Sequence, residues 1–87
     1  MKFYRTPARI YALDSQGALA AEIRFSLTGN KVHCITHTFV DSSLGGQGIA
    51  SQLVRAAVDQ IHAYGGTVTA TCSYASQWLA RHPDALK

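Results

Sequence analysis

Apolar and polar residues alternate along the first half of the chain, and this period of two predicts β-strands with one buried face. The alternation is clearest in the segment 18–27, whose apolar positions are Ala21, Ile23, Phe25 and Leu27. A strand is also predicted over 8–13, before the polar turn 14–17, and another over 32–40, which is rich in β-branched and aromatic residues. The residues 28–31 carry a hairpin turn signal. We therefore expect an antiparallel meander in the first half.

A helical spacing replaces the alternation in the second half. After a loop over 41–47, apolar residues recur at intervals of three and four from about 48 to 64, at Ile49, Leu53, Ala57, Val58 and Ile61. Two glycines end this helix, a short strand follows over 67–71, and a second helix is predicted over 74–81 with Ser73 as its N-cap. Strands joined by a helix are parallel, with a right-handed crossover. The predicted fold class is therefore α+β: an antiparallel strand meander followed by a βαβ unit with parallel strands and a short C-terminal helix.

The composition is that of a globular chain. Of the 87 residues, 47% are hydrophobic and 15% are charged, which excludes a disordered chain and suits a single domain over 1–87. No apolar run approaches the roughly 20 residues of a membrane span, and no apolar segment of signal-peptide length follows Met1. We therefore expect a cytoplasmic protein with no membrane partner and with its two cysteines reduced. Monomer and homodimer both remain open.

The net charge is +3, and the basic residues are scattered along the sequence without a cluster. This mild excess favours a small anionic ligand over nucleic acid. A nucleic-acid or protein-interaction domain would rest on the basic charge alone. We therefore expect no nucleic-acid partner.

A glycine-rich segment, Leu44-Gly45-Gly46-Gln47-Gly48-Ile49-Ala50, lies between a predicted strand and a predicted helix. Glycines let the backbone approach a ligand closely, and the start of a helix offers free N–H groups. These features favour a phosphate group as the ligand. The segment lacks the lysine of a Walker loop, and Ser51 stands where a dinucleotide-binding loop needs its third glycine. A glycine-rich connection without any ligand is the alternative.

This segment resembles the Gln/Arg-x-x-Gly-x-Gly/Ala pattern with which GNAT acetyltransferases hold the pyrophosphate of CoA. It matches at Gly48 and Ala50 and departs at Gly45, where that family has arginine or glutamine. The stretches 37–40, 46–50, 71–74 and 82–83 together resemble a short GNAT-like family of predicted N-acetyltransferases. Ala70 departs from the proline that this family often has two residues before its cysteine.

The resemblance implies a minimal acetyl-CoA-binding domain that transfers an acetyl group to an amine, either a small molecule or a protein lysine or N-terminus. The pyrophosphate would bind backbone amides of the glycine segment, and the pantetheine would run along the strand 38–40. The implied cofactor contacts are Thr38, Phe39, Val40, Gly45, Gly46, Gln47, Gly48, Ile49, Ala50, Ser51, Cys72, Ser73 and Tyr74. No metal is implied. The alternative is a module that binds CoA or acyl-CoA with little or no catalysis.

Cys72 is the first catalytic candidate. It follows the carboxyl end of the strand 67–71, the edge at which ligands bind in open α/β units, and it precedes a helix whose N-terminus favours a thiolate. In similar small family members this cysteine is a catalytic candidate. It is either a nucleophile, or a residue that positions the acetyl group, or a small apolar residue that fills a strand–helix corner.

His37 is the second catalytic candidate, because it lies on the strand expected beside the pantetheine and could accept a proton from the amine. A histidine with an ordinary structural role is the alternative. Glu22 is expected to be a solvated residue of the neighbouring strand, and Tyr74 either an acid or a packing residue. Cys34 is expected to be buried, and Trp78 with Leu79 to anchor the last helix to the core.

Overall fold

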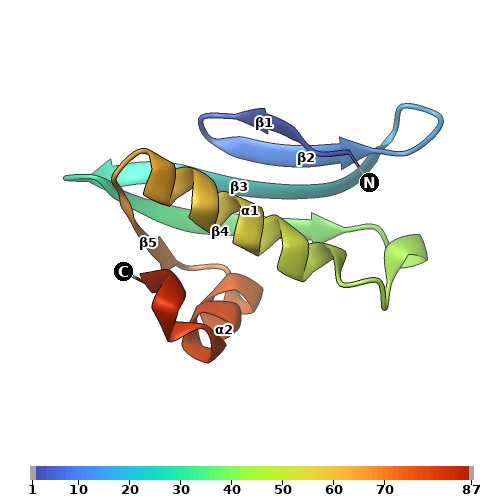
Figure 1. Cartoon of the computed structure of the whole chain (residues 1–87). Coiled ribbons are helices and arrows are strands. Elements are labelled where there is room, and N and C mark those ends of the chain that lie inside the picture. The colour runs from blue at the N-terminus through green and yellow to red at the C-terminus, as the bar shows by residue number, and fades with distance from the viewer. Residues whose placement is uncertain (1, 87) are drawn as a thin grey trace.

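Five strands form one sheet in the order β1-β2-β3-β4-β5 (Figure 1). The computed structural model describes residues 2–86, and of Leu86 only the backbone. The strands are β1 (Tyr4–Thr6), β2 (Arg9–Leu13), β3 (Leu19–Gly29), β4 (Val32–Val40) and β5 (Thr67–Ala70). The helices are α1 (Ile49–Ala63) and α2 (Ser73–Arg81), with short 3-10 turns at η1 (Ser42–Leu44) and η2 (Pro83–Leu86). The first four strands are antiparallel, and β4 and β5 are parallel.

The predicted architecture is therefore confirmed, and the differences are local. The strand β1 was not predicted, because its three residues are all exposed and carry no apolar alternation. The expected loop before α1 contains the single turn η1. The N-cap of α2 is Cys72 and not Ser73, which is already the first helical residue.

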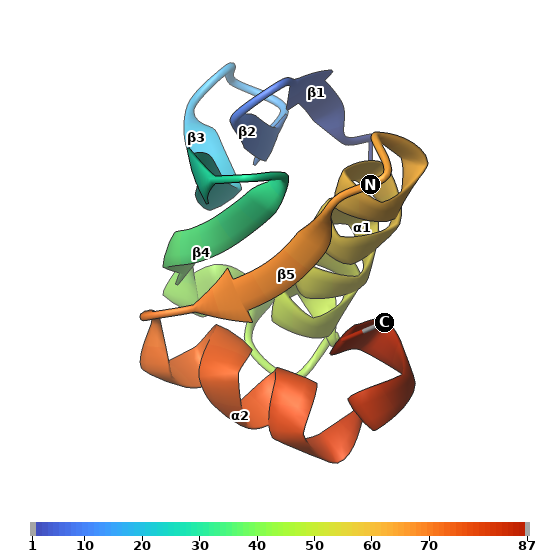
Figure 2. The same cartoon turned by 90° about the vertical axis from the view of Figure 1, so that its left-hand side faces the viewer.

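The core lies between the sheet and α1, which covers one face of the sheet (Figure 2). Ile23 of β3 and Ile35 of β4 point into this layer, as do Leu53 and Ile61 of α1, and all four side chains are fully buried. Burial of each such side chain stabilises the fold by about 1.5–3 kcal/mol. The last helix is fixed to the same core by Ala75, Trp78 and Leu79, as predicted for the last two.

The opposite face of β1–β4 carries no helix within residues 2–86 (Figure 2). Alternation along the strands places polar and aromatic side chains there, opposite the core-facing residues. Within the same residues, no helix has the length and apolar character needed to cross a bilayer.

One extra residue in β4 changes the register of the sheet. Arg24 of β3 lies opposite His37, whereas the next residue, Phe25, lies opposite Ile35, so Thr36 is left over as a bulge. The parallel pairing with β5 ends at the same place, with Ile35 opposite Ala70. Beyond this point β4 continues alone on its β5 side (Figure 1).

Gly66, between α1 and β5, permits a close approach of two segments, and replacing it tests the fold. In Gly66→Ala the new Cβ would lie 2.8 Å from the Lys31 carbonyl oxygen and 2.8 Å from His33 Nδ1. That carbonyl accepts the Thr67 amide at 2.9 Å and is held in place. We expect the free energy of unfolding to fall by about 1–3 kcal/mol in urea denaturation.

The matched control is Gly29→Ala, whose Cβ would meet no atom within 4 Å. This variant is expected to stay within about 0.5 kcal/mol of the wild type. Equal losses in the two variants would contradict the close contact at Gly66.

Candidate functional site

Unpaired backbone amides gather where the glycine segment enters α1. The amide of Gly45 donates to the Ser42 carbonyl oxygen at 3.1 Å, and the first helical hydrogen bond runs from Gln52 to Gly48 at 3.1 Å. Between them, within the described chain, the amides of residues 46–51 donate to no protein acceptor. Gly45 is thus an exception among the residues whose amides were expected to bind the pyrophosphate, because its amide already donates to Ser42.

The backbone conformation of Gly46 and Gly48 sets the course of the chain through these unpaired amides. Their φ angles are 79° and 70°, in the left-handed region that favours glycine. A Cβ at either position would meet no atom within 4 Å, so crowding does not explain the two glycines. The same observation shows open space in front of both residues. The positive end of the α1 dipole adds to the attraction of this space for an anion.

The edge of β4 beyond the bulge adds a second set of backbone groups. Before the bulge, Ile35 directs its carbonyl toward β5, where it accepts the amides of Thr71 at 3.0 Å and Cys72 at 3.2 Å. The bulge reverses the alternation, so Thr38 and Val40 direct their backbone groups to that side afterwards. Because β5 has no residue paired there, this edge is open to an extended ligand.

Cys72 lies beside this edge. Its thiol donates to Thr38 Oγ1 at 3.5 Å, and its side chain is half-buried at the start of α2. Burial alone would raise the pKa of this thiol, but the Thr38 hydroxyl and the nearby amides of Ala75 and Tyr74 outweigh it and hold the pKa below its ordinary value. The structure shows no capping hydrogen bond of the neutral thiol to the helix, so these amides act on the pKa as donors close enough to favour the thiolate.

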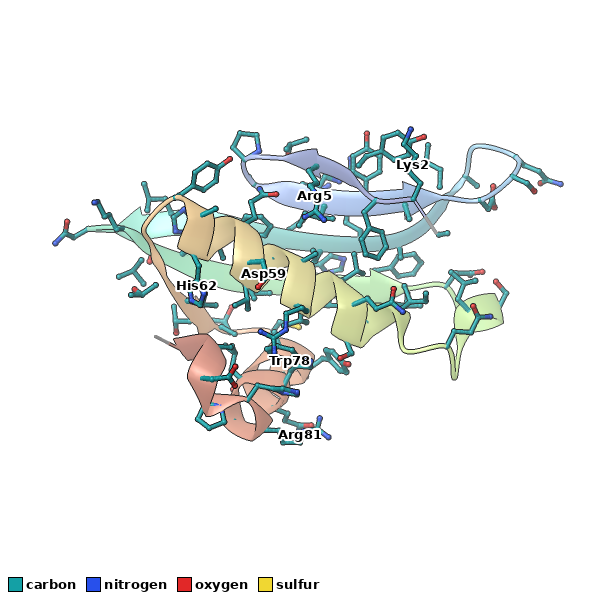
Figure 3. The ribbon with its side chains drawn as sticks, in the orientation of Figure 1. Lys2, Arg5, Asp59, His62, Trp78 and Arg81 are labelled. Atoms are coloured by element: carbon teal, nitrogen blue, oxygen red, sulfur yellow. The ribbon has the colours of Figure 1, made fainter. Side chains whose placement is uncertain are left out.

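Trp78 joins α2 to the beginning of α1 (Figure 3). Its indole Nε1 donates to Ser51 Oγ at 2.9 Å, and the Arg55 guanidinium lies 4.9 Å from the centre of its ring. This hydrogen bond joins Ser51, an expected cofactor contact, to Trp78, which was expected to anchor the last helix. This pairing could not be predicted from the sequence, because the two residues lie in different helices.

The remaining expected cofactor residues fall into two groups. Gln47 is exposed in the loop, Ile49 is buried beneath it, and Ala50 is partly exposed. At the start of α2, Ser73 is exposed and Tyr74 packs against the core, as one of its two expected roles requires.

His37 and Phe39 lie on the open face of the sheet, opposite to the face reached by Thr38 and Val40. His37 Nε2 lies 3.8 Å from Glu22 Oε1, and about half of its side chain is exposed. The structure therefore places His37 one residue from Thr38 along β4, but with its side chain on the other side of the sheet.

Glu22 differs from its expected role as a solvated residue. It is only 4% exposed, and its carboxylate accepts hydrogen bonds from Nε of Arg9 and, at 3.1 Å, from Nε of Arg24. Burial raises the pKa of this carboxyl, but the two guanidiniums outweigh it and hold the pKa below its usual value. The expectation of scattered basic residues is likewise wrong here, because the antiparallel pairing of β2 and β3 sets Arg9 directly opposite Arg24.

A pocket of about 270 Å³ lies elsewhere, between β5 and α2. Its lining is mostly apolar and includes no residue of the glycine loop: Val68, Thr69, Ala70, Ser76, Leu79 and Ala80. The free amides therefore do not line this pocket.

These features define an α+β domain with unpaired backbone amides at a helix start beside an open strand edge. Residues 9–87 match the family described as GCN5-related N-acetyl-transferase, and the chain belongs to this GNAT family. A search of curated proteins finds no significant match.

Solved structures agree with this assignment. A GCN5-like protein from Staphylococcus aureus, solved by NMR, is similar with a TM-score of 0.79 and 27% identity over 97% of this chain and 82% of that one. A GNAT-family N-acetyltransferase from Escherichia coli, YhbS, was crystallised in complex with CoA and matches with a TM-score of 0.66 and 27% identity. That match covers 87% of this chain but only 48% of the E. coli protein. An IAA acetyltransferase from Bacillus cereus shares the fold, with a TM-score of 0.67 and 23% identity over 86% of this chain and 52% of that one. The predicted GNAT-like fold is confirmed.

The contact between Thr38 and Cys72 predicts a change in thiol reactivity. Thr38→Val removes the hydroxyl, which can donate a hydrogen bond to the thiolate once the thiol has lost its proton, so the pKa of Cys72 is expected to rise. The rate of alkylation by iodoacetamide, followed at Cys72 by peptide mass spectrometry, should then reach its midpoint at a higher pH than in the wild type.

Thr36→Val is the matched control, because Thr36 is exposed on the same strand and donates no hydrogen bond to Cys72. Its pH profile should coincide with that of the wild type. A coincident profile for Thr38→Val as well would show that the hydroxyl does not govern the thiol.

Proposed function

We propose that the chain acts as one unit over residues 1–87 that binds acetyl-CoA and transfers its acetyl group to an amine. The observation that carries this proposal is the run of unpaired amides over residues 46–51 at the start of α1. Amides at a helix start bind phosphate groups through hydrogen bonds and through the helix dipole. The relative from E. coli that was crystallised with CoA supports the choice of CoA as the phosphate-bearing ligand.

The open edge of β4 is the proposed place of the pantetheine arm. Its amide groups would pair with the backbone of Thr38 and Val40, which face the side that β5 leaves free. The arm would then run from the glycine loop toward Cys72, beside Thr38. Phe39 contributes only its backbone to this arrangement, because its side chain lies on the other face.

Two residues are proposed to act near the thioester. The amine attacks the acetyl carbon, the carbon–sulfur bond breaks, and CoA leaves as a thiolate. Cys72 lines the thioester end and orients the acetyl group against Thr38. His37 accepts the proton that the amine loses, since it follows the bulge directly and its imidazole is accessible.

A CoA-binding module with little catalysis is the second candidate. One observation favours it: the carboxylate nearest to His37, that of Glu22, is already paired with two arginines and cannot serve as a free base. This candidate predicts tight binding of CoA without turnover of any amine.

Transfer is tested with the purified chain, acetyl-CoA and a panel of primary amines, with release of free CoA as the readout. Binding is measured separately by thermal unfolding, in which acetyl-CoA at a hundred times its dissociation constant stabilises the protein by about 2.7 kcal/mol. Stabilisation without CoA release on any amine would establish the second candidate. No stabilisation would contradict both.

Cys72→Ala is expected to keep the fold and most of the affinity for acetyl-CoA but to lower the rate of transfer. The reason is that the half-buried side chain contacts Thr38 and packs only at the border of the core. Cys34→Ala is the matched control, because Cys34 is a buried strand residue outside this contact. Unchanged turnover in Cys72→Ala would remove Cys72 from the mechanism.

A further inference from the structure

A row of basic side chains crosses the open face of the sheet. In register, Arg9 of β2 lies opposite Arg24 of β3, and Arg24 lies opposite His37 of β4. Like charges directly opposite each other destabilise a sheet. Such a row therefore needs a compensating charge or a ligand.

Glu22 supplies part of this compensation and also orients the arginines. Both arginine–carboxylate ion pairs found among residues 2–86 share its buried carboxylate, and His37 Nε2 lies 3.8 Å from the same group. Both arginines use Nε for this contact, and within the described chain their terminal Nη groups donate to no protein acceptor. The two guanidiniums are thus fixed at one edge and keep free donors at the other.

The row retains excess positive charge and is held in place by aromatic side chains. Two arginines against one carboxylate leave a net charge of +1 before His37 is counted. The Arg9 guanidinium stacks 4.0 Å from the centre of the Tyr11 ring, and Tyr11 in turn stacks on Tyr4 at 5.4 Å. Oriented guanidinium donors of this kind bind carboxylate and phosphate groups with two parallel hydrogen bonds.

The row ends at His37, the proposed proton acceptor, whose side chain lies on the face of the sheet opposite to the side chain of Thr38. His37 follows the bulge in β4 directly, next to Thr38, which contacts Cys72. Neighbouring strands lie about 4.8 Å apart, so an anion held at Arg24 or Arg9 would lie roughly 5–10 Å from an amine at His37.

We infer that the cationic row of Arg9 and Arg24 binds an anionic group of the acetyl acceptor, so that the acceptor is an amine that also carries a carboxylate or a phosphate. This inference rests on the proposed transfer to an amine. Arg9 and Arg24 determine specificity in this arrangement, and Glu22 is a positioning residue that acts through them.

Binding is tested first, without any dependence on turnover. Protein saturated with CoA, which carries no acetyl group, is titrated with 4-aminobutyrate, with 2-aminoethyl phosphate and with butylamine, and the Nε–Hε signals of Arg9 and Arg24 are followed by NMR. The two anionic probes distinguish a carboxylate from a phosphate. Either of them should move both arginine signals, and butylamine should not.

The kinetic test compares Arg24→Gln with Lys31→Gln, which removes the same charge at the tip of the β3–β4 hairpin. In Arg24→Gln the KM for the anionic amine should rise by about 10- to 100-fold, as expected for the loss of a charge-assisted hydrogen bond, with kcat and the KM for butylamine little changed. Lys31→Gln should behave as the wild type. Thermal unfolding checks that each variant is folded and still binds acetyl-CoA.

The outcomes separate the two levels of the proposal. If acetyl-CoA fails to stabilise the wild type, the proposed function fails, and the titration is repeated on the free protein to test the row alone. If acetyl-CoA binds but neither anionic probe moves the arginine signals, or butylamine moves them equally, the row is an internal ion network and the inference is overturned.

Discussion

The first turn of an α-helix leaves backbone amides without intrahelical acceptors, and the architecture described above depends on how this chain treats them. Many helices satisfy such amides with a capping side chain, but Gly48 has none to offer. The left-handed backbone at Gly46 and Gly48 turns the chain so that the amides of residues 46–51 meet no protein acceptor within the described residues. The stability of α1 must therefore come from its packing on the sheet and from the Trp78–Ser51 hydrogen bond.

The bulge at Thr36 determines which groups of β4 lie at its open edge and which lie on each face of the sheet. Because one extra residue reverses the alternation, the backbone of Thr38 faces the open edge while the side chain of His37 faces the bare side of the sheet. Pairing with β5 stops at the same position. The bulge thus leaves an open strand edge at Thr38, beside the Cys72 thiol, and directs the His37 imidazole to the opposite face of the sheet.

Much of this arrangement could be predicted from the sequence, because it follows from local patterns. The alternation in β3, the apolar spacing in α1 and the glycines before it each indicate their element without reference to the rest of the chain. The strand β1 could not be predicted, since its exposed residues carry no such pattern. The burial of Glu22 and its pairing with Arg9 and Arg24 depend on the register between β2 and β3, which no local pattern determines. The bulge that shifts the register between β3 and β4 likewise leaves no mark in composition.

The central claim is that the amides of residues 46–51 hold the diphosphate of CoA, and a backbone-amide NMR titration tests it most directly. Adding CoA should move the amide signals of these residues, whereas pantetheine, which lacks the diphosphate, should leave them in place. The Gly45 amide, already bonded to Ser42, should move less. Saturation by CoA with these amide signals unmoved would contradict the account.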